Sequence, residues 1–271
     1  MAHEPAFRRV VILCDGACDI RLAVGDAATL AARWGVALHG IYLGDENLRR
    51  LAALPFGQQV SLSGAVLSED LHSGDVATLS SALGAGMRRA VAEAAEKLGI
   101  EWSFGSTNEL PSASALAGDE GDMLVIEGVT RAFSGSWRPR SALEHRAGAF
   151  TRTLLIRCRR HEGRGVLIIL PAAAGDRRKV LEAGAAMAAG EDDITVLAPD
   201  TRDAERQSTA TIGAAGVTPR LRFETRSADG PALLHRIAAI NPALIAIDGG
   251  ESVEVIRTLI SEARHDLLIV R

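Results

Sequence analysis

The feature that most constrains the fold is a strand–loop–helix–strand unit between residues 122 and 159. Two short apolar runs, 123–127 and 153–157, enclose a polar loop and a segment of helical period. A shorter form of the unit returns at 243–271, where the loop is only Asp248-Gly249-Gly250. Units of this kind build parallel sheets, in which ligands bind at the carboxyl ends of the strands.

The same alternation of strands and helices runs through the whole chain and occurs twice. The first copy has expected strands at 10–14, 36–43, 100–104, 123–127 and 153–157, and helices at 19–32, 76–98, 110–117 and 140–147. After the polar linker 161–165, the second has strands at 166–170, 194–198, 220–225, 243–247 and 267–270, and helices at 177–189, 201–214, 231–240 and 252–263. This pattern predicts an α/β, Rossmann-like fold of two tandem doubly wound five-stranded parallel-sheet domains, 1–160 and 161–271.

Local signals delimit two of the expected helices. Asp19 is placed to cap the first helix and Gly35 to end it. The helix 76–98 carries an apolar stripe that we expect to be buried, formed by Leu79, Leu83, Met87, Val91, Ala94 and Leu98. The segment 45–75 has no steady period; 47–54 favours a helix over the sheet edge, and the remainder a mobile lid.

Composition excludes several classes of function. The chain has 271 residues, 47% hydrophobic and 24% charged, so it can bury a core. A net charge of −4 and a pI near 6.0 predict no nucleic-acid partner. The absence of a signal-peptide pattern and of about twenty consecutive apolar residues predicts a cytoplasmic protein with no membrane partner.

Catalytic and metal-binding patterns are also missing from the sequence. The three cysteines and seven histidines are dispersed, without the spacing of metal ligands. Ser134 and Ser136 are not in a Gly-x-Ser-x-Gly elbow, and Glu144 and His145, adjacent on a helix, diverge in direction. No P-loop or dinucleotide-binding glycine motif is present. We therefore expect no metal and no enzymatic activity.

The candidate ligand-binding residues lie in the first copy. Asp15 follows the first strand, where it either meets a ligand or forms a turn or helix cap. Arg131, Arg138 and Arg140 surround an aromatic loop, and arginine forks bind phosphate. The alternative is a solvated loop whose Trp137 packs against the other domain. Further hydroxyl candidates are Thr130 and Ser141, of which Ser141 is alternatively a helix cap.

Three features together resemble the universal stress protein (UspA-like) family in its tandem two-domain form. They are the opening run 10–16, which ends in Asp-Gly; the long excursion after the second strand; and the closing helix 141–146 followed by an apolar strand. The resemblance covers essentially the whole chain. It implies the adenine-nucleotide alpha-hydrolase-like fold of that family.

The resemblance also implies an adenine-nucleotide site, which this sequence alters. In nucleotide-binding members a Gly-x2-Gly-x9-Gly-Ser/Thr loop cradles phosphates, and the acid equivalent to Asp15 meets the adenine or ribose. Counting from Gly128, the later positions hold Arg131, Ser141 and Ala142. The motif is degenerate, so we expect the usual ATP site to be absent or much altered, with an ATP- or AMP-type nucleotide as the candidate ligand. The second copy, with its truncated loop, is expected not to bind.

Three functions follow as alternatives. The first is a stress-response regulatory protein whose tandem domains form a pseudo-dimer, with a protein partner and further homodimerisation by edge-to-edge pairing of the strands 153–157 and 267–270. The second is a sensor of a nucleotide or other anionic small ligand, which binds in the first domain alone. The third is a nucleotide hydrolase or transferase, for which the sequence offers no metal or base.

Overall fold

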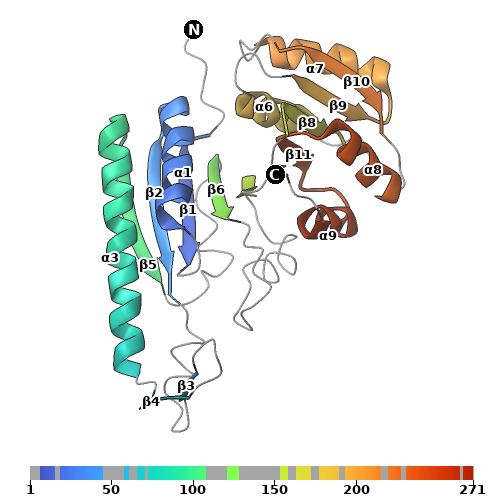
Figure 1. Ribbon diagram of the computed structural model, residues 1–271. Coiled ribbons are helices and arrows are strands. Elements are labelled where there is room, and N and C mark those ends of the chain that lie inside the picture. Colours follow the sequence, from blue (N-terminus) through green and yellow to red (C-terminus); the bar gives the residue numbers. More distant parts are fainter. Residues whose placement is uncertain are drawn as a thin grey trace. The chain divides into compact units, whose positions relative to one another are not determined.

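The computed structural model describes residues 7–15, 19–44, 58–60, 66–70, 73–107, 121–127, 153–157, 163–171, 177–188, 193–214, 219–226, 230–262 and 265–270. The fold is α/β, as expected, and the chain divides into two compact units (Figure 1). The smaller unit contains the strands from β1 to β5, and the larger one the strands from β6 to β12.

The smaller unit is a parallel sheet with two helices. Its strands have the order β5-β2-β1, formed by β1 (Arg9–Asp15), β2 (Ala37–Leu43) and β5 (Trp102–Thr107). The helices α1 (Ile20–Trp34) and α3 (Ser73–Leu98) pack against each other and on these strands. The segment without a clear period contains an antiparallel hairpin that sequence reasoning missed, β3 (Gln58–Val60) and β4 (Val66–Asp70).

The two residues expected to begin and end α1 cap the helix as predicted. The Asp19 carboxylate accepts a hydrogen bond from the backbone N–H of Leu22 at 3.3 Å, and Gly35 ends the helix with a φ of 64°. Between them, the alanine-rich face of α1 is buried at Ala23, Val24, Ala27, Ala28 and Ala31. Small side chains let the helix lie close to the sheet.

The expected apolar stripe of α3 is wrong at its two ends. Met87 and Val91 are buried, but Leu79 is 54% exposed and Leu98 is 42% exposed. A spacing of four residues advances around a helix by about 40° at each step, so Leu79, two such steps before Met87, lies off the buried face, whereas Leu98 is the last residue of the helix. The expected helices at 47–54, 110–117 and 140–147 lie outside the described residues.

The larger unit contains a doubly wound arrangement. Its strand order is β10-β9-β8-β11-β12-β7-β6. The strands are β6 (Asp122–Glu127), β7 (Thr153–Arg157), β8 (Val166–Ile169), β9 (Ile194–Ala198), β10 (Leu221–Thr225), β11 (Leu244–Asp248) and β12 (Asp266–Val270). The helices are α6 (Arg177–Met187), α7 (Thr201–Ala214), α8 (Gly230–Ile240) and α9 (Val253–Glu262). Every expected strand and helix of the second copy is present, with bounds shifted by at most two residues.

The one antiparallel pair in this series joins β12 to β7, and it changes the expected assembly. Each of these strands has a neighbour on both sides: β11 and β7 flank β12, and β12 and β6 flank β7. The edge-to-edge pairing that we expected between two chains is therefore made within one chain. The homodimer itself stays a prediction.

The pairing also explains why the compact units do not follow the sequence repeats. Because β7 pairs with β12, the strands β6 and β7 belong to the same unit as β8 to β12. The boundary between the repeats near residue 160 stays a prediction.

A glycine sets the distance between α6 and the sheet. A Cβ atom added at Gly184 would lie 2.7 Å from Cδ1 and 2.8 Å from Cγ1 of Ile168, a fully buried residue of β8. It would also lie 3.4 Å from the Cβ of Ala246 in β11. Only a residue without a side chain fits here unless Ile168 changes its rotamer in a packed core.

We predict that Gly184→Ala lowers the free energy of unfolding by about 1–3 kcal/mol through overpacking, although alanine is the better helix former. The matched control is Gly213→Ala in α7, where nothing lies within 4 Å of the added Cβ. That change should stabilise by about 0.5–1 kcal/mol. Urea unfolding measures both, and equal stabilisation at the two sites would contradict the close approach of α6.

Candidate functional site

The structure places only one of the expected ligand-binding residues. Asp15 is the last residue of β1, paired in register with Leu43, so its backbone is at the carboxyl end of the strands of the smaller unit. Its side-chain surroundings lie outside the described part of the chain. The same holds for the whole of the remaining set, Gly128, Thr130, Arg131, Arg138, Arg140 and Ser141. Their role stays a prediction.

The order of the strands reverses at one point in the larger unit. The chain leaves β8 toward β9 on one side and leaves β11 toward β12 on the other. Since β8 and β11 are neighbours, their carboxyl ends form the position at which doubly wound sheets bind ligands. The short loop that begins at Asp248 is located here.

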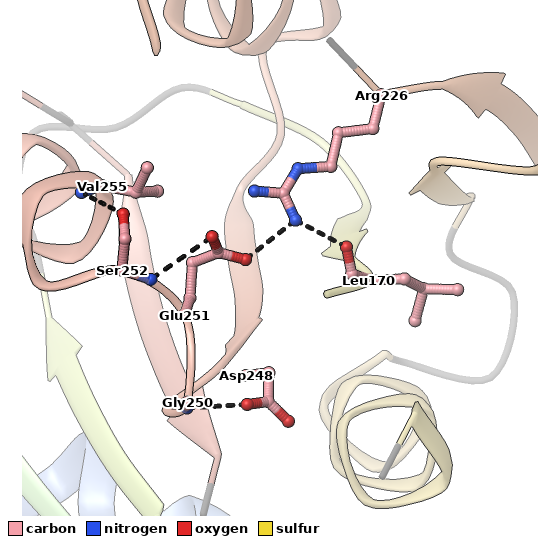
Figure 2. A network of polar contacts seen from close by, with 7 residues as sticks. All are labelled: Leu170, Arg226, Asp248, Gly250, Glu251, Ser252 and Val255. Atoms are coloured by element: carbon pink, nitrogen blue, oxygen red, sulfur yellow. Dashed lines mark hydrogen bonds and ion pairs between the residues drawn. The ribbon is translucent and has the colours of Figure 1, made fainter. Parts of the chain in front are cut away.

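A buried arginine spans this edge of the sheet (Figure 2). Arg226 follows β10, and its backbone N–H donates to the carbonyl of Ala198 at 2.8 Å. Its Nη1 atom donates to the carbonyl of Leu170 at 2.7 Å and to Oε2 of Glu251 at 2.8 Å. The side chains of Arg226 and Glu251 are 6% and 11% exposed. One guanidinium therefore joins the ends of β8 and β10 to the loop before α9.

The loop turns tightly so that Glu251 reaches the arginine. Oδ1 of Asp248 accepts a hydrogen bond from the backbone N–H of Gly250 at 2.6 Å. The backbone carbonyl of Asp248 accepts a second hydrogen bond from the backbone N–H of Glu251 at 3.1 Å. Ser252 then caps α9, its Oγ accepting from the N–H of Val255 at 3.3 Å. Oε1 of Glu251 accepts from the N–H of Ser252 at 3.3 Å, so the carboxylate is at the N-terminus of this helix.

These contacts lower the pKa of the Glu251 carboxyl below its ordinary value of 4.5. The hydrogen bond from Arg226 is the largest cause; its charge and the N–H of Ser252 act in the same direction, whereas burial opposes them. Glu251 is thus ionised at neutral pH. Nε of Arg226 is buried and has no hydrogen-bond partner among the described residues.

Sequence reasoning missed this pair. It treated the second copy as non-binding because of the truncated loop and did not consider Arg226 or Glu251. The sequence shows only that both residues follow expected strands of one parallel sheet, whose carboxyl ends lie at the same edge; β9 and β8 lie between β10 and β11, so adjacency of strands could not have indicated the contact.

A contact between a histidine and a serine in the smaller unit is a structural pair between strands rather than a catalytic one. Nδ1 of His39 and Oγ of Ser103 are 2.6 Å apart. The two residues are directly opposite each other in β2 and β5, within the strands rather than at their carboxyl ends. The geometry is that of a cross-strand pair on the sheet surface.

Two further properties concern the described residues as a whole. They include no group of three His, Cys, Asp or Glu side chains that could hold a metal ion. None of their helices is long and apolar enough to cross a membrane.

Comparison with solved structures shows which fold this is. A protein of unknown function from Pseudomonas aeruginosa PAO1 is similar with a TM-score of 0.55 and 13% identity, over 98% of this chain and 93% of that one. A candidate universal stress protein from Pseudomonas aeruginosa UCBPP-PA14 has a TM-score of 0.54 and 12% identity, over 98% and 94%. The cytoplasmic domain of a prokaryotic cation chloride cotransporter has a TM-score of 0.51 and 10% identity, over 97% and 95%.

No family model matches the chain, and no curated protein matches its sequence. The similarity to solved structures is one of fold. The chain has the UspA-like α/β fold that the sequence resemblance implied.

The ion pair predicts a pH-dependent stability. Because the pKa of Glu251 is lower in the folded state than in the unfolded state, its contribution is fully present above pH 4.5 and is lost as the pH falls through the folded pKa. We expect Glu251→Gln to cost about 1–3 kcal/mol at pH 7 and progressively less under acid conditions. Urea unfolding across this pH range measures the difference.

The control is Glu224→Gln, which removes a carboxylate that is 2.7 Å from Arg236 in a partly exposed pair. A pair of this kind contributes below about 1 kcal/mol. If Glu251→Gln lowered the free energy of unfolding at pH 7 by no more than Glu224→Gln does, the ion pair between Arg226 and Glu251 would not stabilise the loop before α9.

Proposed function

We propose that the chain is a universal-stress-protein-like regulatory protein in which two UspA-like halves form an intramolecular pseudo-dimer. The similarity of fold supports the class. The observation that carries the pseudo-dimer is the antiparallel pairing of β7 with β12, because these are the closing strands of the two sequence repeats.

The register of this pair is that of a two-fold interface. In the sequence repeats Leu154-Leu155-Ile156 corresponds to Leu267-Leu268-Ile269. The pairs in the structure are Leu155 with Leu268, Leu154 with Ile269, and Ile156 with Leu267. Each contact is thus repeated with the two halves exchanged, and the local axis passes between Leu155 and Leu268. A two-fold interface requires this reciprocity.

Regulation by contact with a protein partner fits this arrangement better than catalysis. The degenerate loop that begins at Gly128 supports the loss of the usual ATP site. The cytoplasmic domain of the cotransporter is a case of a similar fold within a larger protein. Homodimerisation is part of this proposal, through a surface other than β7 and β12.

A cysteine pair tests the pseudo-dimer. In a background without native cysteines, Leu155→Cys with Leu268→Cys should form a disulfide within one chain, because directly opposite residues of antiparallel strands have the required separation. The control is Leu154→Cys with Leu267→Cys, which are not opposite each other and should stay reduced. Non-reducing mass spectrometry measures both. Disulfides between chains, or none in the first variant, would refute an intramolecular pair.

Nucleotide titration separates the two leading functions. We expect ATP, ADP and AMP, with or without magnesium, to leave the melting temperature of the full chain unchanged, since a ligand stabilises only the state that binds it. A rise in melting temperature that Asp15→Ala abolishes would instead establish the second candidate, a nucleotide or anionic-ligand sensor in the first half. The position of Asp15 at the carboxyl end of β1 is the observation that favours this candidate.

A further inference from the structure

The strand β5 forms an open edge of the smaller unit. It pairs with β2 on one side, and no second strand lies beside it among the described residues. The backbone carbonyl of Glu101 accepts a hydrogen bond from the N–H of Leu38 at 2.9 Å, so every second residue from Glu101 onward directs its backbone groups to β2. The residues between them, Trp102, Phe104 and Ser106, direct theirs to the open edge. Each of these three therefore offers one N–H and one C=O group to a further strand.

This edge lacks the charged side chains that normally keep an open edge from pairing. Natural sheets protect such edges with charged residues, proline or a bulge. The outer strand of the larger unit, β10, carries two charged residues in ion pairs. Nη2 of Arg222 is 3.6 Å from Oδ2 of Asp193, and Oε2 of Glu224 is 2.7 Å from Nη2 of Arg236. The sequence of β5 is Trp-Ser-Phe-Gly-Ser-Thr, without a charge or a proline, so its edge is suited to pairing with another strand.

The aromatic side chains of β5 are only partly covered. Trp102 and Phe104 are half-buried, whereas Leu38 and Tyr42, on the same face of the neighbouring strand β2, are buried. The inner side of Phe104 is covered, because a Cβ atom added at Gly40 of β2 would lie 3.3 Å from its Cδ2 atom. On its other side β5 has no neighbour among the described residues, which accounts for the exposed part of both aromatic side chains.

The edge is complementary to a second copy of itself. In an antiparallel register centred on Phe104, this residue is opposite its own copy, and Trp102 is opposite Ser106 in both directions. Every outward N–H and C=O group of the three residues then has a partner, and the two Phe104 side chains form an aromatic cross-strand pair. The two-fold axis is perpendicular to the sheet, so α3, which packs on β5, lies beside α3 of the second copy and extends the contact (Figure 1).

We propose that β5 is the homodimerisation surface of this protein, through antiparallel pairing with β5 of a second copy about a two-fold axis at Phe104. The partner is a second copy because the outward backbone groups satisfy each other only in this reciprocal register and no charge opposes it. The inference rests on the homodimerisation that the proposed function includes, and it assigns the surface that makes the contact.

Sedimentation velocity of the full chain over a range of concentrations tests this surface. We expect a native dimer that Ser106→Pro weakens at least about tenfold, because proline removes an outward N–H and its ring obstructs a second strand. The N–H of Ser106 is not directed to β2, so this variant should fold. The matched control is Thr225→Pro in β10, whose N–H is directed away from β9 because the N–H of the next residue, Arg226, donates to Ala198. The control should leave the dimer unchanged.

A single cysteine tests the register. In a background without native cysteines, Phe104→Cys should form a disulfide-linked dimer, since the two copies of position 104 would be about 5.5 Å apart at Cα. The control is Ser106→Cys on the same strand, because its two copies would be roughly 14 Å apart along the strands and should stay reduced. Non-reducing mass spectrometry measures both, and circular dichroism checks that each variant is folded.

The outcomes distinguish this surface from the homodimer itself. A monomeric native chain would overturn both. A native dimer that Ser106→Pro weakens no more than Thr225→Pro does, or in which Phe104→Cys links no better than Ser106→Cys, would overturn this surface and leave the homodimer in place. If Ser106→Pro does not fold, the disulfide of Phe104→Cys decides alone.

Discussion

The larger unit depends on the antiparallel contact between β7 and β12. All other pairs in the series from β10 to β6 are parallel, and parallel strands need a crossover connection between them. The reversal at β7 and β12 joins two such parallel series without any crossover. The pairing satisfies the backbone hydrogen-bonding groups along one edge of β7 and one edge of β12. An exposed apolar strand edge would otherwise pair with other molecules. The buried side chains of Leu155 and Leu268 show that the contact is part of the core.

The same unit contains a charged cluster that an apolar core does not require. Taking Arg226 and Glu251 out of water is costly, and a buried ion pair often only balances that cost. The pair nevertheless connects three separate segments, the end of β8, the end of β10 and the loop before α9. The pair is located at the point where the strand order of the unit reverses.

Much of the fold could be predicted from the sequence because its signals are local. Short β-branched runs identified the strands, and Asp19 and Gly35 identified the ends of α1. The apolar run at β12 indicated a buried strand but could not say that its partner is β7 or that the pair is antiparallel. The hairpin β3–β4 was missed since its strands are short and partly polar. The contact between Arg226 and Glu251 forms only when the folded sheet brings two loops together, so no local sequence pattern encodes it. The loop 128–141, which was predicted to bind a ligand, lies outside the described residues.

The pairing of β7 with β12 also has a consequence for folding during synthesis. The residues of β12 follow those of β7 by more than one hundred positions, so β7 is made long before the strand that covers its edge. Contacts of such long range form slowly because the intervening chain must first be ordered. Until then an apolar strand edge is open to other nascent chains, which makes the interval before β12 docks the time at which this protein is most prone to aggregation.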